Sequence, residues 1–164
     1  MSSKERLAAQ RDIAVNRRAR FEYHIDEKLE AGIVLVGSEV KSLREGRANL
    51  TDSYARVNKG ELWLENLHIS PYNPASQFGH EPTRARKLLL HSREIERLMG
   101  KVKIRGYTLV PLRLYFKDGR AKVEVALARG KKSHDKRDSI REREARLDID
   151  RATKTSRRGR RDDS

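Results

Sequence analysis

The chain contains no cysteine, and this absence excludes several kinds of chemistry. Disulfide bonds, thiol nucleophiles and cysteine-ligated zinc sites all need cysteine. The histidines offer no replacement, because none of the five is spaced from another as H-x-x-x-H or H-E-x-x-H. We therefore expect no metal site and no cofactor.

Long apolar runs are also missing. The longest strongly apolar runs, at residues 33–36 and 88–90, are far too short to span a bilayer. Residues 1–7 lack the apolar stretch that a secretory signal peptide needs. These features predict a cytoplasmic protein with no membrane partner.

Catalytic motifs are equally scarce. The chain has no phosphate-binding G-x-x-x-x-G-K-[ST] loop, and no nucleophile stands at a convincing spacing from a base. Asp148 and Asp150 offer two carboxylates for magnesium, but they lie in a segment that has no core to fix their geometry. We expect no catalytic residue and a protein that is not an enzyme.

Positive charge, in contrast, is in large excess. The net charge is +14, and a field of this size favours polyanions, nucleic acid first among them. Aromatic residues make up only 5% of the chain, which disfavours a platform that stacks single-stranded bases and favours shape-based binding to structured RNA. The basic residues recur in clusters at residues 17–20, 84–87, 101–105, 131–132 and 157–161.

Residues 13–130 are predicted to form one folded body. Residues 1–12, which precede it, are predicted to be a flexible segment. Regular βα alternation is absent, so a parallel sheet is not expected. We predict a mainly β fold, an antiparallel barrel of the OB type with about six strands and two short helices. The strands are predicted from alternating or β-branched apolar runs at residues 21–25, 33–36, 53–57, 62–67, 107–116 and 121–129.

Caps and turns mark the boundaries of these elements. Ser38 is expected to cap the first helix, and Gly46 to end it in the left-handed conformation. The second helix is expected to run from a cap at Ser92 to a stop at Gly100. An Asp-Gly pair at residues 118–119 predicts a hairpin turn between the last two strands. Proline at residue 111 predicts an edge or irregular position within the first of them.

Residues 131–164 form a basic tail that cannot build a core. From residue 130 onward thirteen residues are Lys or Arg and eight are Asp or Glu, while the large apolar residues are Ile140, Leu147 and Ile149. Glu142 and Arg146 form a helix-favouring i, i+4 pair, but so few apolar anchors cannot offset the entropy lost on ordering. We predict a tail that is disordered in isolation and helical when bound to phosphate.

Five blocks of the sequence, taken in their order along the chain, indicate a protein family. The tail begins Gly-Lys-Lys-Ser-His-Asp-Lys-Arg at residues 130–137. Earlier blocks read Asn-Arg-Arg-Ala-Arg at residues 16–20, Leu-Glu-Ala-Gly at 29–32, Gly-Ser-Glu-Val-Lys-Ser-Leu-Arg at 37–44 and Pro-Thr-Arg-Ala-Arg-Lys-Leu-Leu-Leu at 82–90. Together they resemble the small protein B (SsrA-binding protein) family of bacterial trans-translation, over nearly the whole body.

The resemblance implies a monomeric OB-type barrel that binds the tRNA-like domain of transfer-messenger RNA (tmRNA, or SsrA RNA) and delivers it to stalled ribosomes. It also implies that the tail occupies the decoding centre of the small subunit and the empty mRNA channel. The residues expected to bind tmRNA are Arg17, Arg18, Arg20, Glu30, Arg84, Arg86, Lys87, Leu89 and Lys122. Those expected to act in the tail are Lys131, Lys132, His134, Asp135, Lys136, Arg137, Asp148, Arg151 and Lys154.

Glu30, Leu89 and His134 are expected to act other than by binding phosphate. Glu30 is expected either to accept from base amino groups or to orient a neighbouring arginine, because a carboxylate repels phosphate. Leu89 is expected to support the surface by packing. His134 is either a ring that stacks on an unpaired base or a solvated side chain without a role.

Two other functions remain compatible with the composition. A general OB-fold ribosomal or assembly protein would bind folded RNA without preferring tmRNA. An RNA-processing enzyme would consume its substrate in an assay supplemented with metal ions.

Overall fold

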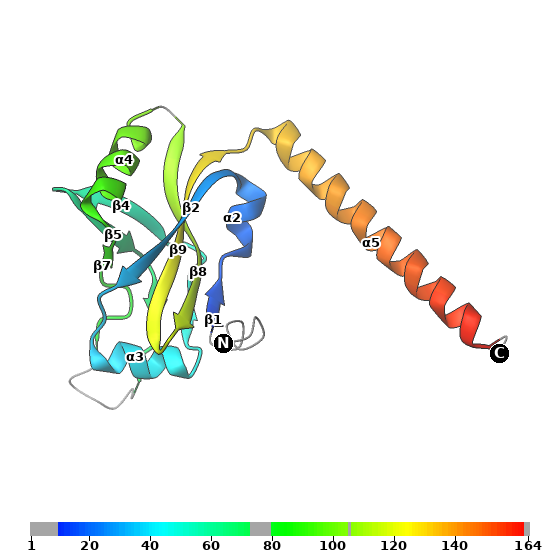
Figure 1. Cartoon of the computed structure of the whole chain (residues 1–164), viewed down its shortest axis with the longest axis horizontal. Helices are drawn as coiled ribbons and strands as arrows, with labels where there is room; N and C mark the ends of the chain where they lie inside the picture. The colour runs from blue at the N-terminus through cyan, green and yellow to red at the C-terminus, as the bar shows by residue number, and fades with distance from the viewer. Residues whose placement is uncertain (1–9, 73–79, 105, 163–164) are drawn as a thin grey trace. The chain divides into compact units, whose positions relative to one another are not determined.

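A computed structural model describes residues 10–72, 80–104 and 106–162 of the chain (Figure 1). The chain divides after Gly130 into two units, and all described strands lie in the first. These strands are β1 (Gln10–Val15), β2 (Tyr23–Ile33), β3 (Ala48–Asn49), β4 (Tyr54–Asn58), β5 (Glu61–Glu65), β6 (His68–Ile69), β7 (Arg86–Leu89), β8 (Tyr107–Lys117) and β9 (Arg120–Gly130).

Six strands of the first unit close into an antiparallel barrel. Around the ring the order is β8, β4, β5, β7, β2 and β9, and β9 pairs again with β8. Closure pairs the edges of the sheet with each other, except along part of β8. Outside the ring, β1 adds to the edge of β8, and β3 pairs with β6 in a small second sheet.

Leucine fills most of the barrel interior. Alternate residues of each strand point inward, as in β5, where Leu62 and Leu64 are fully buried. α3 (Gly37–Arg44) and α4 (Ser92–Val102) lie at opposite ends of the barrel in Figure 1 and contribute Leu43 and Leu98 to the same core. Burying one such side chain contributes roughly 1.5–3 kcal/mol, so this interior is the main source of stability.

The predicted mainly β fold with an OB-type barrel is confirmed. The long hairpin joins β8 to β9 through Asp118 and Gly119, whose φ angles of 51° and 77° are those that a two-residue turn between twisted strands needs. Gly46 follows α3 with a φ of 74°, as expected for a left-handed stop.

The entry to the barrel differs from the prediction, because Phe21 and Glu22 belong to a helix and not to a strand. This helix, α2 (Arg17–Glu22), begins at Asn16, whose side chain accepts from the Ala19 N–H at 3.2 Å and donates to the carbonyl of Pro111 at 3.0 Å. A capping asparagine that is anchored on a distant strand forces the chain to turn there. The basic cluster at residues 17–20 therefore lies on a helix.

The predicted strand at residues 33–36 is also wrong for its last three residues. β2 ends at Ile33, and the side chains of Val34 and Val36 are 44% and 47% exposed. Glu39 is the cause, because its carboxylate accepts from the Val36 N–H at 2.9 Å and so makes Val36, not Ser38, the residue before α3. His91, not Ser92, precedes α4, which passes through Gly100 and ends at Val102.

Residues 10–12, predicted to be flexible, belong to β1. Because β4 pairs with β8 only through Ala55 and Leu109, the rest of that edge of β8 is open, and β1 pairs with it from Gln10 opposite Lys117 to Val15 opposite Arg113. Residues 1–9 of the predicted flexible segment lie outside the described residues.

β8 contains a bulge that decides which of its side chains face outward. The β8–β9 register shifts between Pro111 and Arg113, so Leu112 is an extra residue. Before the bulge Leu109 faces the core, and after it Leu114 does. The shift turns Arg113, Tyr115 and Lys117 to the outer face. Strict alternation from Leu109 would have pointed these three side chains inward. The irregularity predicted at residue 111 is thus confirmed.

The second unit forms the helix α5 (Ser133–Asp162). The described side chains from residue 140 to residue 154 are all exposed, including the apolar Ile140, Leu147 and Ile149. Local terms such as i, i+4 charge pairs favour this helix, but no packed face adds to them. That the free tail is largely unfolded in solution stays a prediction.

Candidate nucleic-acid interface

Two rows of side chains cross the outer face of the barrel. Residues that face each other on adjacent strands lie about 4.5–5.5 Å apart, so each row is continuous. Strand register places Leu89, Gly32, Lys122 and Tyr115 in the first row, and Glu30, Glu124 and Arg113 in the second.

Three residues that the family resemblance singled out meet at one hollow. Glu30, Leu89 and Lys122 line it, on β2, β7 and β9, together with Gly32, Leu90, His91 and Glu94. These residues are far apart in the sequence, and the pairing of β2 with both β7 and β9 brings them together. The hollow is lined by residues with two carboxylates, one ammonium group, one imidazole and two leucine side chains, so it suits a ligand that has N–H donors, an anionic group and an apolar face.

Tyr115 holds the carboxylate of Glu30 in place. Its hydroxyl donates to Oε2 of Glu30, and the Lys117 ammonium group donates to Oε1 and Oε2 at 3.3 and 3.4 Å. Although Tyr115 points outward, it is only 1% exposed, and the guanidinium of Arg113 lies over its ring at 4.1 Å from the centroid. Arg113 is fixed in turn by Asp12 at 2.8 Å and Glu124 at 3.4 Å.

These contacts keep Glu30 ionised and Tyr115 protonated. The hydrogen bond from Tyr115 is the largest influence on the Glu30 carboxyl, and together with Lys117 and Lys122 it outweighs partial burial and lowers the pKa of that group. Burial, followed by the hydrogen bond to Glu30, raises the pKa of Tyr115. The surface therefore presents a fixed anion, a hydrogen-bond acceptor, among cations.

Replacing Tyr115 by phenylalanine is expected to raise the pKa of the Glu30 carboxyl. The change removes the donor that most favours the ionised form and leaves the ring that Arg113 covers. A pH titration of the Glu30 side-chain carbon shift by NMR measures the effect. Tyr107→Phe is the matched control, since Tyr107 lies under Arg129 and contacts no residue of this cluster in the described structure. An unchanged Glu30 pKa in Tyr115→Phe would contradict this account.

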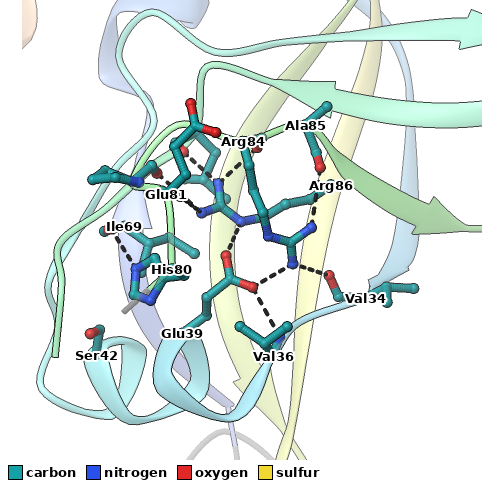
Figure 2. A network of polar contacts seen from close by, with 12 residues as sticks. Val34, Val36, Glu39, Ser42, Ile69, His80, Glu81, Arg84, Ala85 and Arg86 are labelled. Atoms are coloured by element: carbon teal, nitrogen blue, oxygen red, sulfur yellow. Dashed lines mark hydrogen bonds and ion pairs between the residues drawn. The ribbon is translucent and has the colours of Figure 1, made fainter. Parts of the chain in front are cut away.

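A second polar cluster lies beneath the segment before β7 (Figure 2). The guanidinium groups of Arg84 and Arg86 both donate to the carboxylate of Glu39, which is fully buried and also accepts from the Val36 N–H. Arg86 donates further to the carbonyls of Leu67 at 2.6 Å and Pro82 at 3.1 Å. The cluster joins α3 to the segment that enters β7.

Arg86 therefore differs from its predicted role. Its side chain is 0% exposed, and its donors are used by Glu39 and by backbone carbonyls, so it cannot reach a phosphate in this structure. A buried arginine needs a buried partner, and the sequence does not show that Glu39 is that partner. Arg84, with 29% of its side chain exposed, lies at the edge of the same cluster, where a phosphate could approach it.

The other predicted basic residues of the body are at the surface. Arg17, Arg18 and Arg20 are exposed on α2, where Arg18 pairs with Glu22 at 3.1 Å. Lys87, on the outer face of β7, is 40% exposed and pairs with Glu61 at 3.2 Å. These ion pairs are exposed and weak, so they do not prevent contact with a phosphate.

The predicted tail residues all lie in the second unit. Lys131 and Lys132 precede α5, and Lys132 is exposed. Among the helical residues Arg137, Asp148, Arg151 and Lys154 are exposed and Lys136 is half-buried, while the side chains of His134 and Asp135 lie outside the described residues.

Sequence reasoning missed Tyr115, Arg113 and Lys117. The segment was correctly predicted as a strand, but the phase of its alternation was not, because the bulge at Leu112 inverts it. Pro111 was the available signal, and it marked where the phase would change without giving its direction.

Among the described residues no group of three or more histidine, aspartate or glutamate side chains could hold a metal ion. Nor does any helix there have the length and apolarity to cross a membrane.

Comparison with known proteins gives consistent matches. The model of the family described as "SmpB protein" matches residues 13–155. An "SsrA-binding protein" of Desulforudis audaxviator is 60% identical over 145 residues, 88% of this chain and 95% of that protein. One of Listeria monocytogenes is 54% identical over 142 residues, 87% of this chain and 92% of that protein.

A solved structure also matches the chain. It is described as "tmRNA-SmpB: a journey to the center of the bacterial ribosome", and it is 57% identical with a TM-score of 0.62. The match covers 73% of this chain and 84% of that one.

Proposed function

Because the chain belongs to the SmpB protein family, we propose that it is an RNA-binding adaptor that binds the tRNA-like domain of tmRNA and delivers it to stalled ribosomes for trans-translation. The family match over residues 13–155 carries this proposal. The partners are tmRNA and the ribosome, and the place of action is the cytoplasm, where ribosomes work. The described residues supply binding groups, and no chemical step is assigned to them.

The barrel supplies the tmRNA-binding surface. Lys122 neutralises a phosphate at the rim of the hollow, and Arg17, Arg18, Arg20, Arg84 and Lys87 add further phosphate contacts. Glu30 accepts from the amino group of a base, which agrees with the way that Tyr115 and Lys117 fix its carboxylate. Arg86 acts indirectly, because it holds Glu39, to which Arg84 also donates.

The tail supplies the ribosome-binding segment. As a helix, α5 places Asp148, Arg151 and Lys154 within two turns, all with exposed side chains. We place residues 131–137 in the decoding centre and the rest of the helix in the mRNA channel, where phosphate supplies the charge that orders it.

Discrimination between RNAs tests the proposal. The full-length protein is expected to bind the tRNA-like domain of tmRNA more tightly than an elongator tRNA at the same salt concentration, as measured by filter binding. Equal affinity for both RNAs would favour a general OB-fold RNA-binding protein instead.

Lys122→Ala is expected to reduce the salt dependence of this binding. Losing one phosphate contact lowers the slope of log K against log salt by about one. Lys101→Ala is the matched control, because Lys101 is exposed on α4 and does not line the hollow. If the slope of Lys122→Ala equals that of the wild type, Lys122 does not contact phosphate.

A further inference from the structure

Arg129 has the last side chain of the barrel before the basic tail begins. β9 ends at Gly130 and α5 begins at Ser133, so only residues 131–132, called the junction below, belong to neither element. The length of the junction sets how closely the tail is tethered to the barrel, because a longer tether lets its end reach a larger volume. Pairing of the last residues of β9 keeps them out of the junction.

β9 is paired on both sides at its end. Arg129 lies opposite Tyr107 of β8, and on the other side Arg129 and Gly130 lie opposite the first two residues of β2. Residues at the end of a strand unpair easily unless their side chains are held. The preceding residue, Ala128, is fully buried in the smaller core cluster, so unpairing that starts at Gly130 would stop there. Arg129 and Gly130 are therefore the residues at risk.

Two side chains hold the guanidinium of Arg129. Its Nε lies 3.4 Å from Oδ2 of Asp26, and its Nη2 donates to Oδ1 at 3.5 Å, so both carboxylate oxygens are engaged. Its Cζ lies over the ring of Tyr107, 5.6 Å from the centroid, and this ring packs against the main core cluster. Asp26 is an extra residue in β2, where the register with β9 shifts. Arg129 thus links the end of β9 to both neighbouring strands.

We propose that Arg129, Asp26 and Tyr107 form a clamp that keeps the junction short, and that Arg129 is a positioning residue for the tail. With the clamp closed, β9 is paired to Gly130 and the junction is residues 131–132. With the clamp open, Arg129 and Gly130 unpair and the junction doubles in length. This inference rests on the proposed function, in which tmRNA holds the barrel while the tail must reach the decoding centre.

The size of the effect follows from the length of the tether. The effective concentration of a tethered group falls roughly as the −3/2 power of tether length, so doubling the junction lowers the concentration of the tail at its site about threefold. The groups with which the barrel binds RNA are unchanged. Loss of the clamp should therefore slow peptide tagging about threefold without weakening tmRNA binding.

The test compares Arg129→Gln, Asp26→Asn and a chain with two glycines inserted after Gly130, all at full length. The substitutions open the clamp while changing the net charge in opposite directions, and the insertion lengthens the junction but keeps the clamp. In a reconstituted assay on ribosomes stalled without a stop codon, all three should tag about threefold more slowly than the wild type. Filter binding should show unchanged affinity for the tRNA-like domain of tmRNA.

Two further measurements separate the clamp from a general loss of structure. Amide hydrogen exchange at Arg129 and Gly130 should become several-fold faster in both substituted chains, while exchange at the buried Val123 stays as in the wild type. A chain that carries Arg129→Gln and Asp26→Asn together should tag no more slowly than either single variant, because both changes remove the same contact.

Arg56→Gln is the matched control, because Arg56 is 47% exposed and pairs with Glu65 between two strands that do not pair with β9. It should change neither tagging nor exchange. If Arg129→Gln slows tagging and Asp26→Asn does not, Arg129 contacts a phosphate directly and the clamp is refuted. The clamp is also refuted if the glycine insertion tags at the wild-type rate, or if either substitution weakens tmRNA binding. If the wild type itself does not support tagging, the proposed function fails.

Discussion

Removal of residues 131–164 is expected to abolish trans-translation while leaving binding to the tRNA-like domain of tmRNA nearly intact. The barrel has its own core, and the division after Gly130 leaves every strand complete. Loss of the tail removes thirteen basic residues and the segment proposed for the decoding centre. A reconstituted assay for peptide tagging on ribosomes stalled without a stop codon measures the first effect, and filter binding at several salt concentrations measures the second.

A variant with residues 131–164 in scrambled order is the matched control for charge. It keeps the composition, and therefore the long-range attraction to RNA, but changes which residues reach the decoding centre. We expect it to bind tmRNA as the wild type does and to fail in tagging. If truncation instead destroys affinity for the tRNA-like domain, the division of labour between barrel and tail is wrong. If the scrambled tail supports tagging, charge alone is sufficient.

Glu39→Gln is expected to destabilise the barrel by roughly 3–5 kcal/mol, because it leaves the buried guanidinium of Arg86 without a countercharge. Both groups are fully buried, and Arg86 is the larger part of the link between α3 and the segment that enters β7. This is a large share of the stability of a small domain. Urea unfolding, followed through the fluorescence of Trp63 in β5, gives the free energy.

Glu65→Gln is the matched control for the loss of a carboxylate. Glu65 pairs with Arg56 on the surface at 2.6 Å, and exposed pairs contribute less than about 1 kcal/mol. A double variant, Glu39→Leu with Arg86→Met, should recover part of the lost stability, because two apolar groups leave no buried charge. A Glu39→Gln variant as stable as Glu65→Gln would show that the buried pair does not hold the fold.

The effect of Glu39→Gln is also expected to depend on pH. Burial raises the pKa of Glu39, but hydrogen bonds from Arg84, the Val36 N–H and Arg86 outweigh it and lower that pKa below its ordinary value of 4.5. Stability from this group is therefore complete above pH 4.5 and is lost as the pH falls through the lower folded value. The stability gap between wild type and variant should shrink in that acid range.

The candidate site shows how far reasoning from the sequence reaches. The family resemblance indicated Glu30, Leu89 and Lys122, and the structure brings all three to one hollow. Counting basic residues placed Arg86 at the RNA surface, but the structure buries it, because charge composition does not reveal which arginine has an internal carboxylate partner. Tyr115 escaped notice because its outward direction depends on the bulge at Leu112.

The sequence by itself determined the fold class and the division of the chain. Local signals suffice for these: alternation within strands, the Asp118-Gly119 turn, and a tail too poor in apolar residues to build a core. Tertiary structure alone decided which side chains face each other. The pairing of β2 with β7 and β9 placed these three strands side by side, and the bulge set the phase of β8. Tertiary packing also buried Arg86 and left Arg84 at the surface. Such outcomes depend on contacts between residues distant in the chain, and local patterns carry no information about them.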